Sequence, residues 1–213
     1  MSEAPILRVM VLLYGVEPTV MRRLELPGDI TLHQFHAVLQ RAFGWESEHL
    51  YGFRCRDKRK GVIGKRRGNV YLEGPVADDL IDADTATFKE LLDIFKIKVM
   101  EYVYDFGDNW VHGIKLEKVI APEPDTLYPR LVEAVGRCPP EDVGGADGYN
   151  HLLEVVRDPN HPDREEYDYW IEEGAELLDQ EKFDPEDLKS EVESMARHWR
   201  EKATGKKGKR KRK

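Results

Sequence analysis

The first third of the chain combines two extended hydrophobic patterns with one helical pattern. Residues 6–14 are apolar and rich in β-branched side chains, and residues 20–26 alternate between apolar and polar side chains. These two stretches predict an N-terminal pair of strands. After Thr31 the apolar positions recur every three or four residues, and Gln34 stands at the spacing of a capping box. This pattern predicts a helix that ends at Gly44.

The middle of the chain returns to strand patterns, and the last third is helical. We expect further strands over residues 49–56, 69–72, 98–106, 110–119 and 128–135. We expect further helices over residues 87–95, 149–157, 164–171 and 185–200. Residues 137–149 contain two adjacent prolines and two adjacent glycines, which indicates a loop.

These elements predict an α+β fold with a mixed, largely antiparallel sheet and packed helices. We expect one domain over residues 1–201, with its strands in residues 5–136 and an acidic helical subdomain in residues 145–201. Residues 202–213 are basic and almost without apolar side chains, so we expect a disordered tail there.

The most distinctive predicted hairpin contains the sequence YDFGDNW. Matching the apolar faces of its two strands places Phe106 opposite Trp110 and leaves residues 107–109 as a three-residue turn. In this register His112 stands among aromatic side chains, whereas Asp105 points to the opposite face. A turn of two or four residues would reverse the relation, because a register shift of one residue exchanges the faces.

Composition indicates a soluble globular protein. The chain has 213 residues, of which 40% are hydrophobic and 35% charged. It has no apolar stretch long enough to cross a bilayer and no signal pattern at its N-terminus, so we expect a cytoplasmic protein without a membrane partner. Two cysteines, Cys55 and Cys138, are too few for a disulfide framework.

Charge is distributed unevenly along the chain. The net charge is −8, but the last twelve residues contain eight basic side chains, which leaves 25 basic against 41 acidic residues in the rest. This excess of acid disfavours nucleic-acid binding across the folded body. Residues 54–67 contain eight basic side chains and one acidic one. Together with the tail at 202–213, this loop keeps open an alternative, an accessory protein that binds nucleic acid without sequence preference.

Several motifs occur in an order that resembles the plasmid pRiA4b ORF-3-like family. They are LELPG from Leu24, GW at 44–45, HL at 49–50, YVYDFGDNWVH from Tyr102 and RCPPEDVGG from Arg137. The resemblance runs from about residue 6 to residue 188. It implies a single α+β domain of undetermined biochemical role, in a family whose members are sometimes carried by mobile elements and labelled as resolvase-like.

The chain departs from the family pattern at two positions. Val143 stands where members commonly have a second cysteine, five residues after Cys138, which excludes a paired-thiol site in this loop. Tyr51 stands where members often have a histidine. A resolvase role is also disfavoured, because none of the four serines lies in an arginine-rich catalytic context.

Imidazole and carboxylate side chains are the usual ligands of zinc, iron and manganese. The candidates for a metal or acid–base site are His36, His49, His112, Asp105, Asp108, Glu141 and Asp142. Their spacing matches no known ligand motif, and His36 and His112 lie on apolar faces, so structural roles are favoured for them. A metal-dependent hydrolase that uses the three histidines remains an alternative, and no cofactor is predicted.

The favoured interpretation is a non-enzymatic binding domain. We expect the PPED loop and the DFGDNW hairpin to be neighbours at one end of the sheet and to form a groove for an unknown protein, a peptide or a small polar ligand. The predicted binding residues are Asp105, Asp108, Trp110, Glu141, Asp142 and Tyr149.

Overall fold

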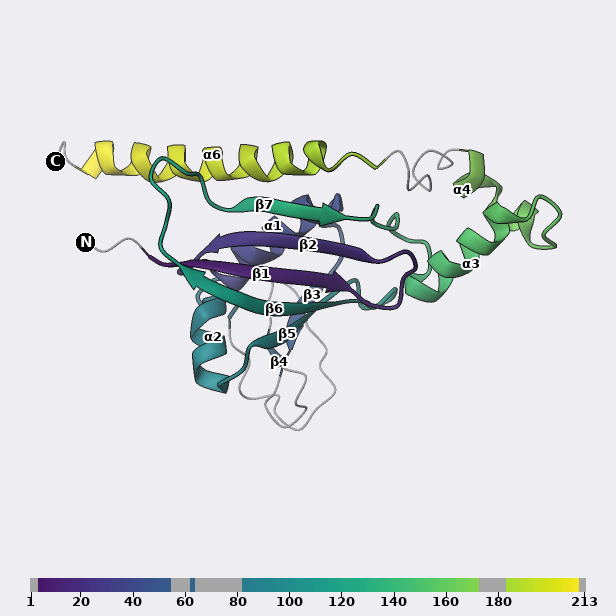
Figure 1. Ribbon diagram of the computed structural model, residues 1–213, viewed down its shortest axis with the longest axis horizontal. Helices are drawn as coiled ribbons and strands as arrows, with labels where there is room; N and C mark the ends of the chain where they lie inside the picture. Colours follow the sequence, from purple (N-terminus) through teal and green to yellow (C-terminus); the bar gives the residue numbers. More distant parts are fainter. Residues whose placement is uncertain (1–3, 55–61, 64–81, 173–182, 211–213) are drawn as a thin grey trace.

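The protein is built around one seven-stranded sheet. The computed structural model describes residues 4–54, 62–63, 82–172 and 183–210 (Figure 1). The strands are β1 (Ile6–Leu13), β2 (Val20–Pro27), β3 (Tyr51–Arg54), β4 (Val62–Ile63), β5 (Val99–Tyr104), β6 (Trp110–Ile120) and β7 (Arg130–Val135). Their order in the sheet is β4-β3-β5-β6-β1-β2-β7, and every described neighbouring pair is antiparallel. The predicted α+β class is therefore confirmed, without a parallel pair among the described strands.

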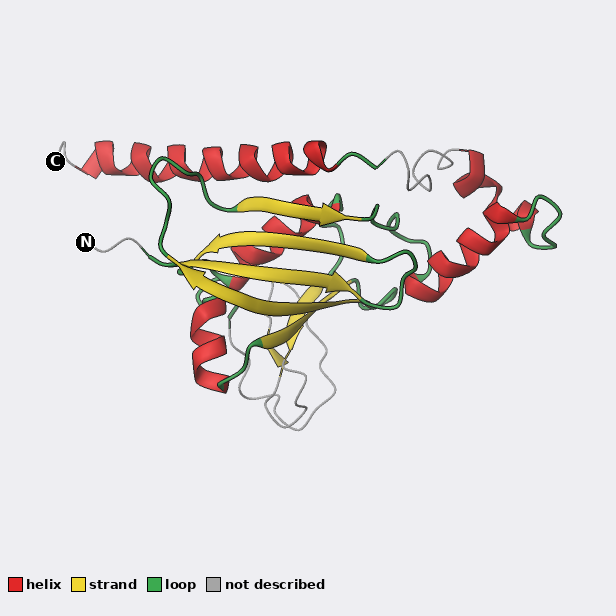
Figure 2. Cartoon of the chain, viewed as in Figure 1, coloured by secondary structure: helices red, strands yellow, loops and turns green. Residues whose placement is uncertain are grey.

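The helices lie on one face, along one edge and beyond one end of the sheet (Figures 1 and 2). They are α1 (Leu32–Phe43), α2 (Phe88–Phe95), α3 (Gly145–Arg157), the 3-10 helix η2 (Arg164–Tyr167), α4 (Asp168–Glu172) and α6 (Pro185–Arg210). Helix α6 runs beside the edge strand β7 and also contacts α1. None of the described helices has the length and apolar character needed to cross a membrane.

Helix α1 covers one face of the sheet, and its ends are where the sequence predicts them. Thr31 and Gln34 form the capping box in both directions, and Gly44 ends the helix in the left-handed conformation at φ 81°. The buried side chains Phe35 and Leu39 join the core together with alternate residues of β1, such as Val9. This packing fixes the position of the loop that follows Gly44.

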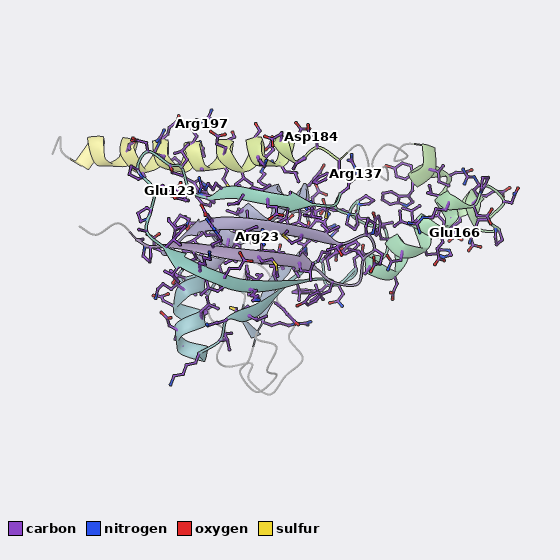
Figure 3. The ribbon with its side chains drawn as sticks, in the orientation of Figure 1. Arg23, Glu123, Arg137, Glu166, Asp184 and Arg197 are labelled. Carbon is purple, nitrogen blue, oxygen red and sulfur yellow. The ribbon has the colours of Figure 1, made fainter. Side chains whose placement is uncertain are left out.

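The opposite face of the sheet carries charged side chains that pair across strands. Glu25 on β2 is fully buried between Arg8 of β1 and Arg130 of β7, at 2.5 Å from each guanidinium. Arg23, labelled in Figure 3, pairs with Glu117 of β6 at 2.9 Å. Apolar and charged side chains therefore alternate along these strands, as they do in an antiparallel sheet that packs one face against helices and turns the other toward solvent.

The predicted register of the β5–β6 hairpin is wrong by two residues. Tyr104, and not Phe106, stands opposite Trp110, so the connection is a five-residue loop over residues 105–109. Asp105 and Asn109 both have positive φ, which turns the chain out of the ladder before Phe106 can pair. A shift of two residues keeps the faces unchanged. His112 therefore packs among aromatic rings as expected, and it stands opposite Tyr102.

The C-terminal part differs from the expectation. The acidic helical subdomain is not confirmed, because α6 packs against β7 and α1 as part of the main body. The backbone of α6 is helical through Arg210, beyond residue 202, where the sequence suggests disorder. Lysine and arginine are favourable helix formers, and extending an existing helix adds one hydrogen bond per residue. Residues 69–72 and most of the basic segment 54–67 lie outside the described residues.

Candidate binding cavity and the His49 cluster

Three loops that are far apart in the sequence meet at one end of the sheet. The first follows α1, the second is the 105–109 loop, and the third contains the PPED sequence. The indole nitrogen of Trp45 donates to the carbonyl oxygen of Pro139 at 3.0 Å, and the backbone N–H of Glu46 donates to Glu141 at 2.8 Å. The structure therefore places the PPED loop directly on the loop after α1.

Contact between the PPED loop and the hairpin loop depends on glycine. The backbone N–H of Gly144 donates to Asp108 Oδ2 at 3.2 Å. Gly145 has φ 70°, and a Cβ atom at this position would lie 2.2 Å from the carbonyl oxygen of Asp108. Only glycine satisfies both the backbone conformation and this close approach.

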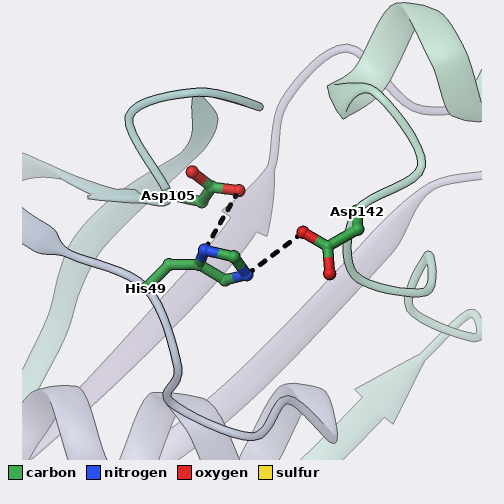
Figure 4. A group of neighbouring side chains, drawn as sticks. All are labelled: His49, Asp105 and Asp142. Atoms are coloured by element: carbon green, nitrogen blue, oxygen red, sulfur yellow. Dashed lines mark ion pairs between the residues drawn. The ribbon is translucent and has the colours of Figure 1, made fainter.

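His49 lies between two carboxylates (Figure 4). Its Nδ1 is 3.7 Å from Asp105 Oδ2, and its Nε2 is 3.2 Å from Asp142 Oδ1. The other oxygen of Asp105 accepts a hydrogen bond from the backbone N–H of Gly107 at 2.9 Å, which orients the carboxylate toward the ring. The side chain of Asp105 is 14% exposed, that of His49 29% and that of Asp142 70%, so the cluster is open to solvent on the Asp142 side.

Tyr104 contacts both the PPED loop and the ring of His49. Its hydroxyl donates to Glu141 Oε1, and its ring packs edge-on against His49. Burial of the phenol, together with this hydrogen bond to a carboxylate, raises the pKa of Tyr104 above its usual range. The phenol therefore stays protonated and keeps donating to Glu141 at neutral pH.

A cavity of about 560 Å³ opens beside these loops. Its aromatic lining residues are Phe43, Trp45, Tyr169, Trp170 and Phe183. Its acidic lining residues are Glu46, Glu48, Glu141, Asp142, Asp184 and Asp187. Arg22 and Arg137 are the basic residues among the described lining, and His49 contributes to the same wall. Figure 3 shows Arg137 and Asp184 near the start of α6. Carboxylates thus outnumber guanidinium groups around the cavity.

Arg22 is a buried structural cation in the wall. Its Nε donates to the carbonyl oxygen of Ala42 at 2.7 Å, and its Nη1 donates to the carbonyl oxygens of Met21, Val135 and Gly136. Burial lowers the pKa of its guanidinium to about 10, so the group remains charged at neutral pH. These bonds join the end of α1 to the end of β7.

The three candidate histidines do not converge. Within the described residues, the group that places three metal-type ligands together is His49, Asp105 and Asp142, without His36 or His112. His36 lies 2.7 Å from the hydroxyl of Tyr102 and stacks on Tyr51. His112 is fully buried, and neither ring nitrogen has a hydrogen-bond partner in the part of the chain described.

The six predicted binding residues fall into two groups. Asp105, Glu141 and Asp142 lie at the meeting loops, and Asp108 holds the PPED loop through Gly144. Trp110 and Tyr149 are each 1% exposed and belong to the core beneath the loops. Of the six, Glu141 and Asp142 line the cavity and can contact a ligand there, whereas Asp105 and Asp108 hold the neighbouring loop and the two aromatic residues support it from the core.

Cys138 lines the cavity but is not primed as a nucleophile. Burial raises the pKa of its thiol well above the usual range, although the positive charge of Arg22 acts in the opposite direction. The reactive thiolate is therefore scarce at neutral pH.

Sequence reasoning missed the residues that form the outer wall of the cavity. Trp170, Phe183 and Asp187 come from the C-terminal segments, which approach the loops only through tertiary packing. Arg22 was also missed, although an arginine on the apolar face of a strand is an unusual residue that signals a buried role.

Comparisons with known proteins agree on the family and the fold. The sequence model of the plasmid pRiA4b ORF-3-like proteins matches residues 5–191. The chain is 39% identical over 200 residues to the uncharacterized protein y4hQ of Sinorhizobium fredii, covering 94% of this chain and 97% of the relative. It also superposes on the crystal structure of the protein of unknown function MM3350 from Methanosarcina mazei with a TM-score of 0.70 and 28% identity, covering 88% of this chain and 98% of that chain.

Proposed function

Because the chain belongs to the plasmid pRiA4b ORF-3-like family, and its relatives above carry no stated activity, we propose a function from the site itself. The protein is a non-enzymatic binding module, and its ligand is a short basic peptide segment that enters the cavity at the end of the sheet. The observation that carries this proposal is the composition of the cavity wall: aromatic rings together with an excess of carboxylates.

The wall favours a cation that also has an apolar part. Six acidic and two basic residues among the described lining give the cavity a negative field, which attracts lysine and arginine side chains. An aromatic face binds such a cation with about 0.5–2 kcal/mol and also packs against the methylene groups of its side chain. Arg22 and Arg137 already lie over the rings of Phe43 and Phe183, so Tyr169 and Trp170 are the faces that a ligand would use. Tyr169 is 65% exposed and is therefore available for such a contact.

The size of the cavity fits a few side chains of a peptide. Ligand-binding pockets typically have volumes of about 300–1,000 Å³, and this cavity has about 560 Å³. Its walls come from loops held by Trp45, Asp108 and Glu141, so a large part of the surface exists before the ligand arrives. Preorganisation of this kind lowers the cost of binding.

A peptide with the sequence of residues 202–213 is a suitable probe, because it contains eight basic side chains. We expect it to bind the full-length protein and to change the fluorescence of the cavity tryptophans. The double variant Asp184→Asn/Asp187→Asn is expected to bind at least about tenfold more weakly, since each lost charge contact weakens the attraction. The matched control is Glu193→Gln/Glu201→Gln, which removes the same number of charges from exposed residues of the same helix that are not part of the described cavity lining.

Two results would contradict the proposal. One is the absence of binding for this peptide and for an array of other lysine- and arginine-rich decapeptides. The other is equal binding by the wild type and the Asp184/Asp187 variant. Equal binding would mean that the peptide is attracted to the general surface charge and does not use the cavity carboxylates.

The remaining expectations from the sequence stay predictions. They are the cytoplasmic location, the association with mobile elements and nucleic-acid binding through residues 54–67 and 202–213. The hydrolase alternative requires His36, His49 and His112 to share one site, and these do not form a common group among the described residues.

A further inference from the structure

We propose that His49, Asp105 and Asp142 bind a divalent first-row transition-metal ion at the rim of the cavity. This inference concerns a different ligand from the peptide and does not depend on the proposed function. The ion would connect three segments: the loop after α1, the hairpin loop and the PPED loop. It would therefore set the spacing of two cavity-lining residues, His49 and Asp142.

The distances allow the three side chains to share one ion. One ligand atom from each residue lies within 4.8 Å of the other two. With metal–ligand bonds of about 2.0–2.2 Å in a tetrahedral arrangement, ligand atoms lie roughly 3.3–3.6 Å apart. The widest pair in the cluster therefore has to approach by up to about 1.5 Å. Asp142 is 70% exposed and has room to make this movement, whereas Asp105 is held by Gly107.

The donor set selects the class of ion. One imidazole nitrogen and two carboxylate oxygens suit zinc, manganese or iron(II), while magnesium prefers oxygen ligands alone. The hydrogen bond from Gly107 to Asp105 is the kind of outer contact that orients a ligating carboxylate.

Charge also favours a cation with two positive charges. Even with a protonated His49, the two aspartates leave the cluster with a net charge of −1. Glu48 and Glu141 lie in the same cavity wall and add to the negative field.

The competing explanation is an imidazolium ion paired with two carboxylates, because Asp105 and Asp142 face different ring nitrogens (Figure 4). In that case the cluster would have no specific affinity for metal.

Calorimetric titration of the full-length protein with Zn²⁺ at neutral pH separates the two explanations. We expect saturable binding of one ion and a rise in the midpoint of thermal unfolding, because the ion binds the folded state. Loss of a group that only orients a metal ligand weakens metal binding by about 10- to 100-fold. Loss of a ligand itself should have a larger effect, so we expect His49→Ala and Asp142→Asn to weaken Zn²⁺ binding by at least about 100-fold. Titration with Mn²⁺, which has little preference for thiolates, should show the same dependence on these residues.

The matched control is His151→Ala. His151 lies 3.0 Å from Asp163 and near His161, so it belongs to a second group of histidine and acidic side chains. Binding that is unchanged in this variant supports the His49 site.

The proposal is overturned if the wild type shows no saturable binding, if His49→Ala and Asp142→Asn bind as well as the wild type, or if His151→Ala removes the binding. Asp142 is exposed, so its variant tests the site even if His49→Ala is unstable. Metal binding without peptide binding would overturn only the proposed function.

Discussion

His112 has an environment that is unusual for a histidine. It is fully buried, and its ring packs against Phe43, Trp45 and Tyr102. Burial lowers the pKa of His112 to about 3, so the side chain behaves as a neutral aromatic group at physiological pH. His49, by contrast, is 29% exposed and lies between two carboxylates at the rim of the cavity. The same residue type thus serves the core at one position and a candidate site at another.

The lowered pKa of His112 predicts a loss of stability in acid. The unfolded chain binds a proton near pH 6.5, whereas the folded state does so only near pH 3, so stability falls as the pH decreases between these values. The expected loss from this residue between pH 7.5 and pH 5 is about 2 kcal/mol. Urea unfolding of His112→Phe should show a smaller decrease over this range. An unchanged pH dependence would show that His112 does not titrate in this way.

At the scale of elements, the loops at the end of the sheet depend on close backbone contacts. Gly145 starts α3 and lies against the carbonyl oxygen of Asp108, so a helix, a loop and a hairpin meet at one glycine. Asp105, Asn109 and Asp142 have positive φ in the same region. The loops are therefore shaped by backbone geometry as much as by side chains.

Substitution of this glycine tests the loop contact. Gly145→Ala combines positive φ with a Cβ atom 2.2 Å from a backbone oxygen, and we expect it to lower the free energy of unfolding by roughly 2–3 kcal/mol. The control is Gly52→Ala in β3, where the nearest atom to an added Cβ would be 3.6 Å away in Phe106. Denaturant unfolding measures both, and equal effects would argue against the contact.

Local signals were sufficient for most elements but not for the hairpin or the cavity. The start and end of α1 depend on Thr31, Gln34 and Gly44, which act within a few residues, and the sequence predicts them correctly. The five-residue hairpin loop depends on Asp105, which leaves the strand and donates its N–H to the carbonyl of Leu50. Such a contact is not visible in the alternation of apolar residues. The meeting of His49 with Asp142 likewise depends on tertiary packing across 92 intervening positions.

At the scale of the whole molecule, the described side chains that attach α6 to the main body lie between Leu188 and Trp199. Val192 and Ala196 are buried, and Met195 and Trp199 pack against the core. Arg41 of α1 pairs with Glu191 at 3.3 Å, but both side chains are more than half exposed, so apolar packing is the main attachment.

Truncation distinguishes the two parts of this helix. Removal of residues 202–213 is expected to change the free energy of unfolding by less than about 0.5 kcal/mol, because the residues of α6 that are described as buried precede this segment, and residues 202–204 are exposed. Removal from Pro185 onward should lower it by several kcal/mol, since it exposes the apolar surface of β7 and α1. Thermal unfolding of both variants provides the measurement. A large effect of the shorter truncation would mean that the basic segment contributes to the fold.

The position of α6 has a consequence for how the chain would respond to an occupant of the cavity. Asp184, Asp187 and Leu188 line the cavity at the beginning of this helix, while its later residues hold the sheet edge. A molecule seated among the loops would therefore touch both the sheet end and the last helix. Occupancy would tie together segments that lie far apart in the sequence, because the lining extends from Arg22 on β2 to Leu188 on α6.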